Sequence, residues 1–284
     1  QLLEGSGNTR NIVCPYHAWS YALDGELRHA RISEKVPGFD KSEFCLQPVR
    51  VDTLCDLVFF NLDPDAESLD SQAPGLAQDL QERIPELGNL RAAESISPFG
   101  SAIAANWKVV VDNFVECYHC PLVHPEFASL VDMSSFQMDT FSNWSRQLAP
   151  DTRPDNTAYP FDSDAPVQSA AFWYLWPTTS IGMFPGSPNL IVLSILPLGH
   201  KKTSFSGYQY ALDIDQDDDI RQQYQVDVLS PPDVALCESV QRGLKSRSYD
   251  QGRFMVDSDT SGIAEHAVHQ FHRLVLSALG SDGY

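Results

Sequence analysis

The sequence has no long apolar run and no targeting segment. No stretch approaches the roughly 18 consecutive apolar residues that a membrane-spanning helix needs. The first residues, QLLEGSGNTR, contain no basic region followed by an apolar one. Neither membrane insertion nor export is indicated, so a cytoplasmic location is expected. Of the 284 residues, 43% are hydrophobic and 20% are charged, which is typical of a folded chain.

Basic residues are scarce. Nineteen lysines and arginines stand against 38 aspartates and glutamates, and the formal net charge is −19. A field of this sign repels phosphate backbones and anionic lipid and favours cations. The composition therefore argues against nucleic acid and membrane surfaces as partners.

Cysteine is thinly spread, and no low-complexity segment or internal repeat stands out. The six cysteines are Cys14, Cys45, Cys55, Cys117, Cys120 and Cys237. In a chain without an export signal this pattern does not favour disulfides, so thiolate metal ligation or burial is expected. Cys117 and Cys120 form a C-x-x-C pair without the second pair that a zinc site needs. Burial is the interpretation favoured for them.

Hydrophobic patterning divides the chain into three parts and indicates an α+β fold. Residues 1–62 read as short strands with an Asp24-Gly25 turn, and 63–90 as an acidic, partly helical connector. Residues 91–284 form a second domain with strands around 170–211, including a hairpin turned at 198–201. Near the end, apolar residues at three- and four-residue steps over 264–279 predict a helix lying on a sheet.

The segment DNFVECYHCPLVH, residues 112–124, has the strongest chemical signal. His119 and His124 would lie about 140° apart on one regular helix, so they cannot share a metal there. Pro121 disfavours helical geometry at Cys120 and would let His124 turn back. Two imidazoles and one carboxylate form the facial triad of non-haem ferrous iron. The alternative is a pair of ordinary helix-end histidines, but the apolar neighbours Phe114, Val115 and Leu122 favour an interior position, where unligated histidines are costly.

Two motifs in the same order resemble a known family. CPYHAWSYALDGEL and NWKVVVDNFVECYHCPLVHPEF are similar to segments of the large subunit of Rieske-type non-haem iron oxygenases, the ring-hydroxylating dioxygenases and related monooxygenases. NLDPD, LCESVQRGLKSRSYDQGRF and AEHAVHQFHRLV extend the resemblance over nearly the whole chain. It implies a partial Rieske β domain followed by a helix-grip (START-like) catalytic domain built on an antiparallel sheet.

The resemblance implies a 2Fe-2S cluster held by a C-x-H pair and a C-x-x-H pair. Cys14 and His17 match the second pair. The family's first pair lies roughly 15 to 17 residues before the second cysteine, and the thirteen residues that precede Cys14 include no cysteine or histidine. We therefore expect the sequence to begin inside the cluster motif, with half of the cluster ligands absent. His29, Cys45 and Cys55 do not have the spacing to replace them.

The resemblance also implies a mononuclear iron site. It maps two ligands onto His119 and His124 and the third onto Asp233 in PDVALCESVQ, with Glu238 as the alternative because Pro232 departs from the family pattern. Glu116 matches the carboxylate that connects the iron site to a cluster histidine of the neighbouring subunit, here His17. Asn113 either lies near the iron or is a helix-surface amide.

The implied function is O2-dependent hydroxylation of a small organic substrate, with electrons supplied by a reductase or ferredoxin. The glutamate of ECYHC is similar to the branch that oxidises choline, betaine and carnitine, so a quaternary ammonium substrate is favoured and a homotrimer is expected. The alternatives are an aromatic ring-hydroxylating dioxygenase and a cluster-less binding protein. The strand FWYLWP, residues 172–177, is expected either in the core or as an aromatic pocket wall.

Overall fold

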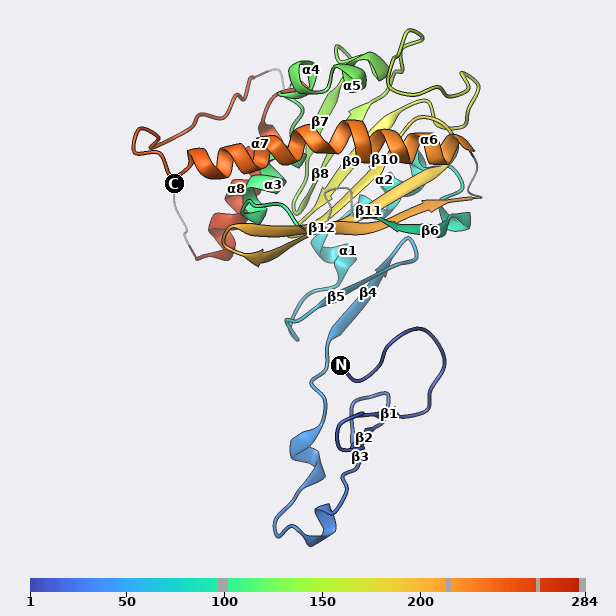
Figure 1. The fold of residues 1–284 in the computed structure, drawn as a ribbon, viewed down its shortest axis with the longest axis vertical. Helices are drawn as coiled ribbons and strands as arrows, with labels where there is room; N and C mark the ends of the chain where they lie inside the picture. The colour runs from blue at the N-terminus through green and yellow to red at the C-terminus, as the bar shows by residue number, and fades with distance from the viewer. Residues whose placement is uncertain (97–101, 213–215, 259–260, 281–284) are drawn as a thin grey trace. The chain divides into compact units, whose positions relative to one another are not determined.

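The computed structural model describes residues 1–96, 102–212, 216–258 and 261–280. The chain divides into two compact units, Gln1–Ser68 (unit 1) and Leu69–Tyr284 (unit 2). Each is described by itself, and Figure 1 gives the element labels.

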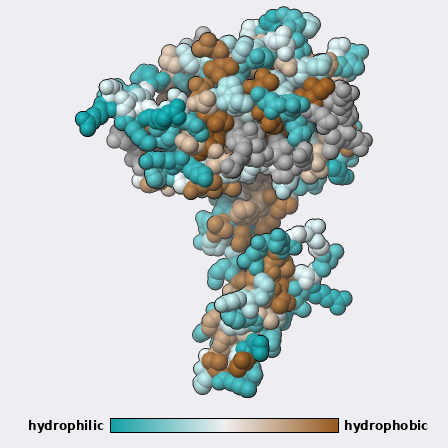
Figure 2. All heavy atoms as spheres, in the orientation of Figure 1, coloured by the Kyte–Doolittle hydropathy of each residue, from teal (hydrophilic) through white to brown (hydrophobic). Residues whose placement is uncertain are grey.

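Unit 1 consists of two small antiparallel sheets. Strands β1 (Ile12–Val13), β2 (Ser20–Tyr21) and β3 (Leu27–His29) form the first, and the hairpin of β4 (Arg50–Leu54) and β5 (Leu57–Asn61) forms the second. Short 3-10 turns span Ser33–Lys35 and Lys41–Phe44. The hairpin exposes large apolar side chains, those of Val51, Val58, Phe60 and Leu62. Figure 2 shows hydrophobic and polar residues side by side on this surface.

The expected connector begins in unit 1 and continues into unit 2, where it packs as helices. Helices α1 (Leu69–Gln72) and α2 (Leu76–Arg83) precede a 3-10 turn at Leu87–Asn89. Leu76 and Leu80 lie one turn apart and are both fully buried. Trp144 Nε1 donates a hydrogen bond to the carbonyl of Pro74 at 3.1 Å. Residues 69–90 are therefore part of unit 2.

Unit 2 is built on a seven-stranded, fully antiparallel sheet with the order β6-β12-β11-β10-β9-β8-β7. The strands are β6 (Arg91–Ile96), β7 (Gln137–Thr140), β8 (Trp144–Ala149), β9 (Ala170–Leu175), β10 (Thr179–Met183), β11 (Asn189–Gly199) and β12 (Lys202–Ala211). The two longest strands, β11 and β12, form the hairpin expected from the sequence, and its turn lies at residues 199–202.

Helices α3 (Trp107–Phe114) and α8 (His266–Ala278) pack in one hydrophobic core. The side chain of Asn106 caps α3 by accepting the N–H of Lys108 at 3.1 Å. The ring of Phe271 meets that of Trp107 edge to face, with centroids 5.6 Å apart. The helix predicted near the C-terminus is confirmed. It buries Val268 and Phe271 of the expected face, whereas Leu279 is 72% exposed.

A long helical stretch crosses the face of the sheet (Figure 1). It begins as α6 (Gln216–Tyr224), passes through a π-helical turn at Gln225–Leu229 and continues as α7 (Ser230–Gly243). In the π turn, the N–H of Ser230 bonds to the carbonyl of Gln225, five residues back. The expected α+β, helix-grip architecture is confirmed. Within the described ranges, none of the helices is long and apolar enough to span a bilayer.

Candidate metal site and substrate cavity

His119 and His124 flank one short helical turn. Helix α3 ends at Phe114, whose carbonyl accepts a hydrogen bond from Gln147 Nε2 on β8 at 2.7 Å. The chain then runs irregularly to His119, forms α4 (Cys120–Val123), and restarts as α5 (Pro125–Leu130) after His124. Because the chain departs from one regular helix here, the centroids of the two imidazole rings lie 5.2 Å apart.

The helix is interrupted at different residues from those expected. Cys120 is the first residue of α4 and Pro121 lies in its first turn, where a proline is tolerated. The breaks lie before His119 and at His124, which has φ −122° and ψ 65° and precedes Pro125. Val115 is buried as expected. The prediction that Leu122 lies inside is wrong: its side chain is on the outer face of the short helix, and the residue is 88% exposed.

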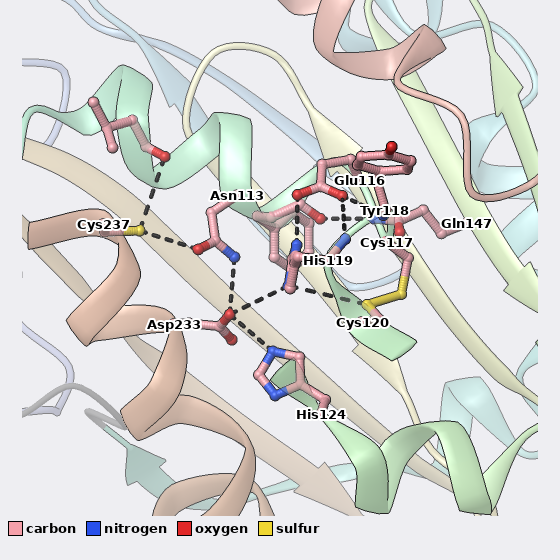
Figure 3. Close-up of polar contacts among 12 residues, drawn as sticks. Asn113, Glu116, Cys117, Tyr118, His119, Cys120, His124, Gln147, Asp233 and Cys237 are labelled. Carbon is pink, nitrogen blue, oxygen red and sulfur yellow. Dashed lines mark hydrogen bonds and ion pairs between the residues drawn. A yellow bond between two sulfur atoms is a disulfide. The ribbon is translucent and has the colours of Figure 1, made fainter. Parts of the chain in front are cut away.

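Asp233, from α7, meets both histidines although it is more than a hundred residues away in sequence. Its Oδ1 atom lies 2.9 Å from His124 Nε2 and 3.4 Å from His119 Nε2. Figure 3 shows the three side chains converging. Their potential ligand atoms all lie within 4.8 Å of one another. Glu238, the alternative, instead accepts the N–H of Ala104 at 3.0 Å.

A second layer of polar residues holds these side chains. Asn113 Nδ2 donates to Asp233 Oδ1 at 2.9 Å, and Cys237 Sγ donates to Asn113 Oδ1 at 3.3 Å. Glu116 Oε1 lies 2.5 Å from His119 Nδ1, while its Oε2 accepts the N–H groups of Tyr118 and His119. Asn113 is thus not a helix-surface amide. Hydrogen bonds of this kind fix the orientation of metal-binding side chains.

The electrostatics of the site favour a cation. Burial works to lower the pKa of His119, but hydrogen bonds from the imidazole to Asp233 and Glu116 outweigh it and raise the pKa to about 9. Burial works to raise the pKa of Asp233, but its hydrogen bonds to His119 and His124 lower it to about 2. Burial raises the pKa of the Cys237 thiol to about 12, so that sulfur stays protonated. Two carboxylates therefore face the histidines, an arrangement that a divalent metal would neutralise.

The donor set fits a mononuclear ferrous ion. Two imidazole Nε2 atoms and one carboxylate are the ligand types of the facial triad, and the Nδ1 of His119 is held by a carboxylate, as is usual for metal-binding histidines. No other group of three histidine, cysteine or carboxylate side chains meets this closely in the described part of the chain.

Cys117 and Cys120 are joined by a disulfide, so the expectation of free cysteines here is wrong. The turn between them, closed by the N–H of Cys120 on the carbonyl of Cys117, brings their Cα atoms to 4.9 Å. This separation lies within the range that a disulfide bridges. Their burial, in contrast, was expected and is found. Cys14, Cys45 and Cys237 are free thiols.

Two adjoining cavities, each of about 110 Å³, reach the three potential ligands. One lies over His119, His124 and Asp233, and the other extends away from Asp233 between the sheet and the long helix. They share Phe114, Phe172, Leu229 and Asp233 as walls. A larger hollow of about 540 Å³ lies on the Glu116 and Cys237 side of the site.

Side chains of the aromatic strand β9 lie both in the core and in the cavity wall, the two positions expected from the sequence. Phe172 lines the two cavities, whereas Trp173 is fully buried and donates through Nε1 to Asp79 Oδ2 at 2.6 Å. Tyr174 packs in the core against Phe271. Alternation of side chains along a strand explains the opposite directions of Phe172 and Trp173.

In unit 1, Cys14 and His17 lie on one tight turn after β1. The N–H of Ala18 bonds to the carbonyl of Cys14 at 3.0 Å, and Ala18 adopts a left-handed φ of 59°. Backbone N–H groups of Tyr16 and His17 lower the pKa of the Cys14 thiol. A 2Fe-2S cluster needs four ligands. Cys14 and His17 would supply two of the four.

Comparisons with known proteins point to one family. The model of the ring hydroxylating alpha subunit (catalytic domain) matches residues 87–281, and that of the Rieske [2Fe-2S] domain matches residues 1–40. The carnitine monooxygenase oxygenase subunit of Escherichia coli (strain K12) is 38% identical over 279 residues, which is 97% of this chain and 73% of that protein. Chloroplastic choline monooxygenase of Arabidopsis thaliana is 28% identical, over 96% of this chain and 64% of that protein.

The three-dimensional comparison agrees. A solved quaternary ammonium Rieske monooxygenase, described in connection with carnitine oxidation and inter-subunit electron transfer, superposes with a TM-score of 0.83 at 35% identity. The superposition covers 98% of this chain and 75% of that one.

Proposed function

The chain belongs to the Rieske-type ring-hydroxylating oxygenases, as a catalytic alpha subunit, and on that premise we propose that it hydroxylates a quaternary ammonium compound with dioxygen. The observation that carries the proposal is the meeting of His119, His124 and Asp233 beside an aromatic-walled cavity. Members of this family act on a small organic substrate with electrons from a protein partner.

In this proposal, His119, His124 and Asp233 hold the mononuclear iron. When bound, ferrous iron would supply the position at which dioxygen is activated. Glu116 keeps Nε2 of His119 free for the metal by accepting the Nδ1 proton. Asn113 holds the carboxylate of Asp233 in place. Both act as positioning residues.

The cavity favours a trimethylammonium group as the part of the substrate next to the metal. Phenyl faces attract quaternary ammonium groups through cation–π interactions, and Phe114 and Phe172 stand beside Asp233. The net charge of −19 also favours an approaching cation. The relatives named for carnitine and choline add to this argument.

The chemistry balances as a monooxygenation. One C–H bond next to nitrogen becomes C–OH, and the second oxygen atom leaves as water after taking up two electrons and two protons. The hydroxylated carbon then loses trimethylamine with the C–N electron pair, and the hydroxyl proton is released as the C=O bond forms. The products are an aldehyde and a protonated amine.

Electrons would come from a reductase or ferredoxin through a Rieske cluster to which Cys14 and His17 contribute. We propose a homotrimer in which Glu116 faces His17 of the next subunit. Its carboxylate accepts three hydrogen bonds within this chain and has the capacity for one more. The exposed apolar hairpin residues of unit 1 support an assembly, since such surfaces mark contacts.

The aromatic walls would also receive an arene, so ring dihydroxylation is the second candidate. A third candidate is a cluster-less binding protein, which would use the apolar cavity beside Asp233. Turnover of trimethylammonium compounds against arenes, with a reductase supplied, separates the first two. The absence of metal from the purified protein would favour the third.

Metal analysis of His119→Ala tests the ligand assignment. We expect about one iron per wild-type chain after anaerobic loading, and loss of most of it in the variant. His269→Ala, which removes an exposed histidine of α8, serves as the matched control and should retain iron. After oxidation of the bound iron to Fe(III), electron paramagnetic resonance should show mononuclear iron in the wild type. Unchanged iron in His119→Ala would refute the ligand assignment.

A further inference from the structure

The cavity that extends from Asp233 between the sheet and the long helix is almost entirely apolar. Its walls include Phe114, Phe172, Phe184, Phe205, Ile191 and Leu193. Among the described residues, no lysine or arginine lines it. A trimethylammonium head group suits these walls, but the opposite end of a betaine or of choline carries oxygen and needs a polar partner.

One buried amide in the cavity wall has no hydrogen-bond partner in the described part of the chain. Gln225 is 5% exposed, and neither its Nε2 nor its Oε1 has a hydrogen-bond partner in the described part of the chain. Leaving a buried amide unpaired costs about 1–3 kcal/mol. A side chain kept in this state inside a ligand cavity is therefore a candidate recognition group.

The other polar side chains of this wall are already engaged. Ser180 Oγ donates to the carbonyl of Leu193 at 3.4 Å, and Ser230 Oγ donates to the carbonyl of Gln225 at 2.6 Å. Asp233 is held by Asn113 and the two histidines. The amide of Gln225 is the polar group of this cavity that still has both donors and an acceptor to offer.

The π turn sets the direction of Gln225 relative to Asp233. Eight residues separate them, which in a regular α-helix is a rotation of about 800° and leaves the side chains about 80° apart. The wider turn at Gln225–Leu229 rotates less per residue and brings both side chains to the cavity. Along the helix axis they are separated by on the order of 10 Å, given a rise of about 1.5 Å per residue. This distance accommodates a short-chain betaine together with its hydrogen bond.

We propose that the side-chain amide of Gln225 recognises the oxygen-bearing end of the substrate, opposite the trimethylammonium group that lies near the metal. The inference rests on the proposed function and adds a specificity-determining residue to it. Nε2 donates a hydrogen bond to the oxygen of a carboxylate or a hydroxyl group, and Oε1 accepts one where the group is a hydroxyl. A betaine has no net charge, because its trimethylammonium group balances its carboxylate. A neutral amide can therefore bind the carboxylate without a lysine or arginine.

Calorimetric binding to the purified chain tests the assignment with two matched ligand pairs. The first pair is γ-butyrobetaine and n-butyltrimethylammonium, which differ by the carboxylate. The second pair is choline and ethyltrimethylammonium, which differ by the hydroxyl. The protein variants are Gln225→Met, which keeps the shape and removes the amide, and Gln225→Glu, which adds a charge that repels carboxylate. Gln223→Met, an exposed residue of the same helix, is the matched control.

We expect Gln225→Met to reduce the preference for the oxygen-bearing member of at least one pair about tenfold, while binding of the apolar member stays the same or tightens. Gln225→Glu should weaken γ-butyrobetaine more than choline, and Gln223→Met should match the wild type. Thermal melting checks that each variant is folded.

Two outcomes would overturn the inference. If the wild type binds these ligands and Gln225→Met leaves the preference within both pairs unchanged, Gln225 has no recognition role although the proposed substrate class stands. If the wild type binds none of the four ligands, the proposed substrate class is wrong, and the inference fails with it.

Discussion

Replacing Asn113 by leucine should weaken metal binding without unfolding the protein. The amide Nδ2 donates to Asp233 Oδ1 at 2.9 Å, and Asp233 is ionised because its pKa is held near 2. Leucine has the same number of side-chain heavy atoms and a similar branched shape, but no donor. The carboxylate would then lose one of the groups that fixes its position between the two histidines.

The size of the effect follows from the type of hydrogen bond. A hydrogen bond to an ionised acceptor contributes about 1.5–3 kcal/mol, which corresponds to a factor of roughly 10 to 100 in affinity. This agrees with the range of about 10- to 100-fold for residues that orient metal ligands. Cys237→Ala should have a smaller effect, since the thiol contacts Asp233 only through the amide of Asn113, at 3.3 Å.

Titration with Co²⁺, an air-stable substitute for Fe²⁺, provides the assay. Asn143→Leu is the matched control, because it removes an amide that donates to the carbonyl of Gln72 away from the site. A dissociation constant for Asn113→Leu equal to that of the control would refute the reasoning. It would mean that Asp233 is held by the histidines and the metal alone.

Two further predictions concern stability. Arg146→Met should lower the free energy of unfolding in urea by about 3 kcal/mol, because Arg146 pairs with Asp79 in a largely buried position. Arg153→Met removes an exposed pair with Asp155 and should lower it clearly less, so equal losses would contradict the reasoning. Hydrogen bonding to Asp112 raises the pKa of His272 above 6.5, so their pairing stabilises the fold at pH values below 6.5 and is lost as pH rises through the folded-state pKa. Asp112→Asn should therefore destabilise the protein more at pH 6 than at pH 9 in denaturation curves, by less than about 1 kcal/mol since both groups are partly exposed, and a loss independent of pH would count against this.

Local sequence patterns predicted the parts of the fold that depend on near neighbours. Apolar spacing identified the C-terminal helix, and the long apolar run with its polar turn identified the β11–β12 hairpin. The resemblance to a family supplied the candidate Asp233, which no local pattern connects to His119. Sheet order and the approach of α7 to α4 depend on contacts between distant segments, so periodicity did not show them.

Three features escaped prediction for identifiable reasons. The Cys117–Cys120 disulfide depends on the geometry of a turn, which cysteine count and spacing do not indicate. The outward direction of Leu122 follows from the short length of α4, which hydrophobicity alone does not indicate. The role of Gln225 depends on a π turn, and nothing in its neighbouring residues marks one. For Phe172 and Trp173, the alternation of side chains along a strand could have been used to predict that one lies in the cavity wall and the other in the core.

The π turn at Gln225–Leu229 sets the rotation of the α6 side chains relative to those of α7 about the helix axis. Substitutions that turn these residues into regular α-helix, without changing their number, would leave Gln225 about 80° from Asp233 around the helix axis. Gln225 would turn away from the cavity while Asp233 remained with its histidines. Along this helix, the proposed metal-binding residue and the proposed substrate-recognition residue can therefore be changed separately. Selectivity in this scaffold is open to redesign by changing the helix type at the π turn, without changing a residue of the proposed metal site.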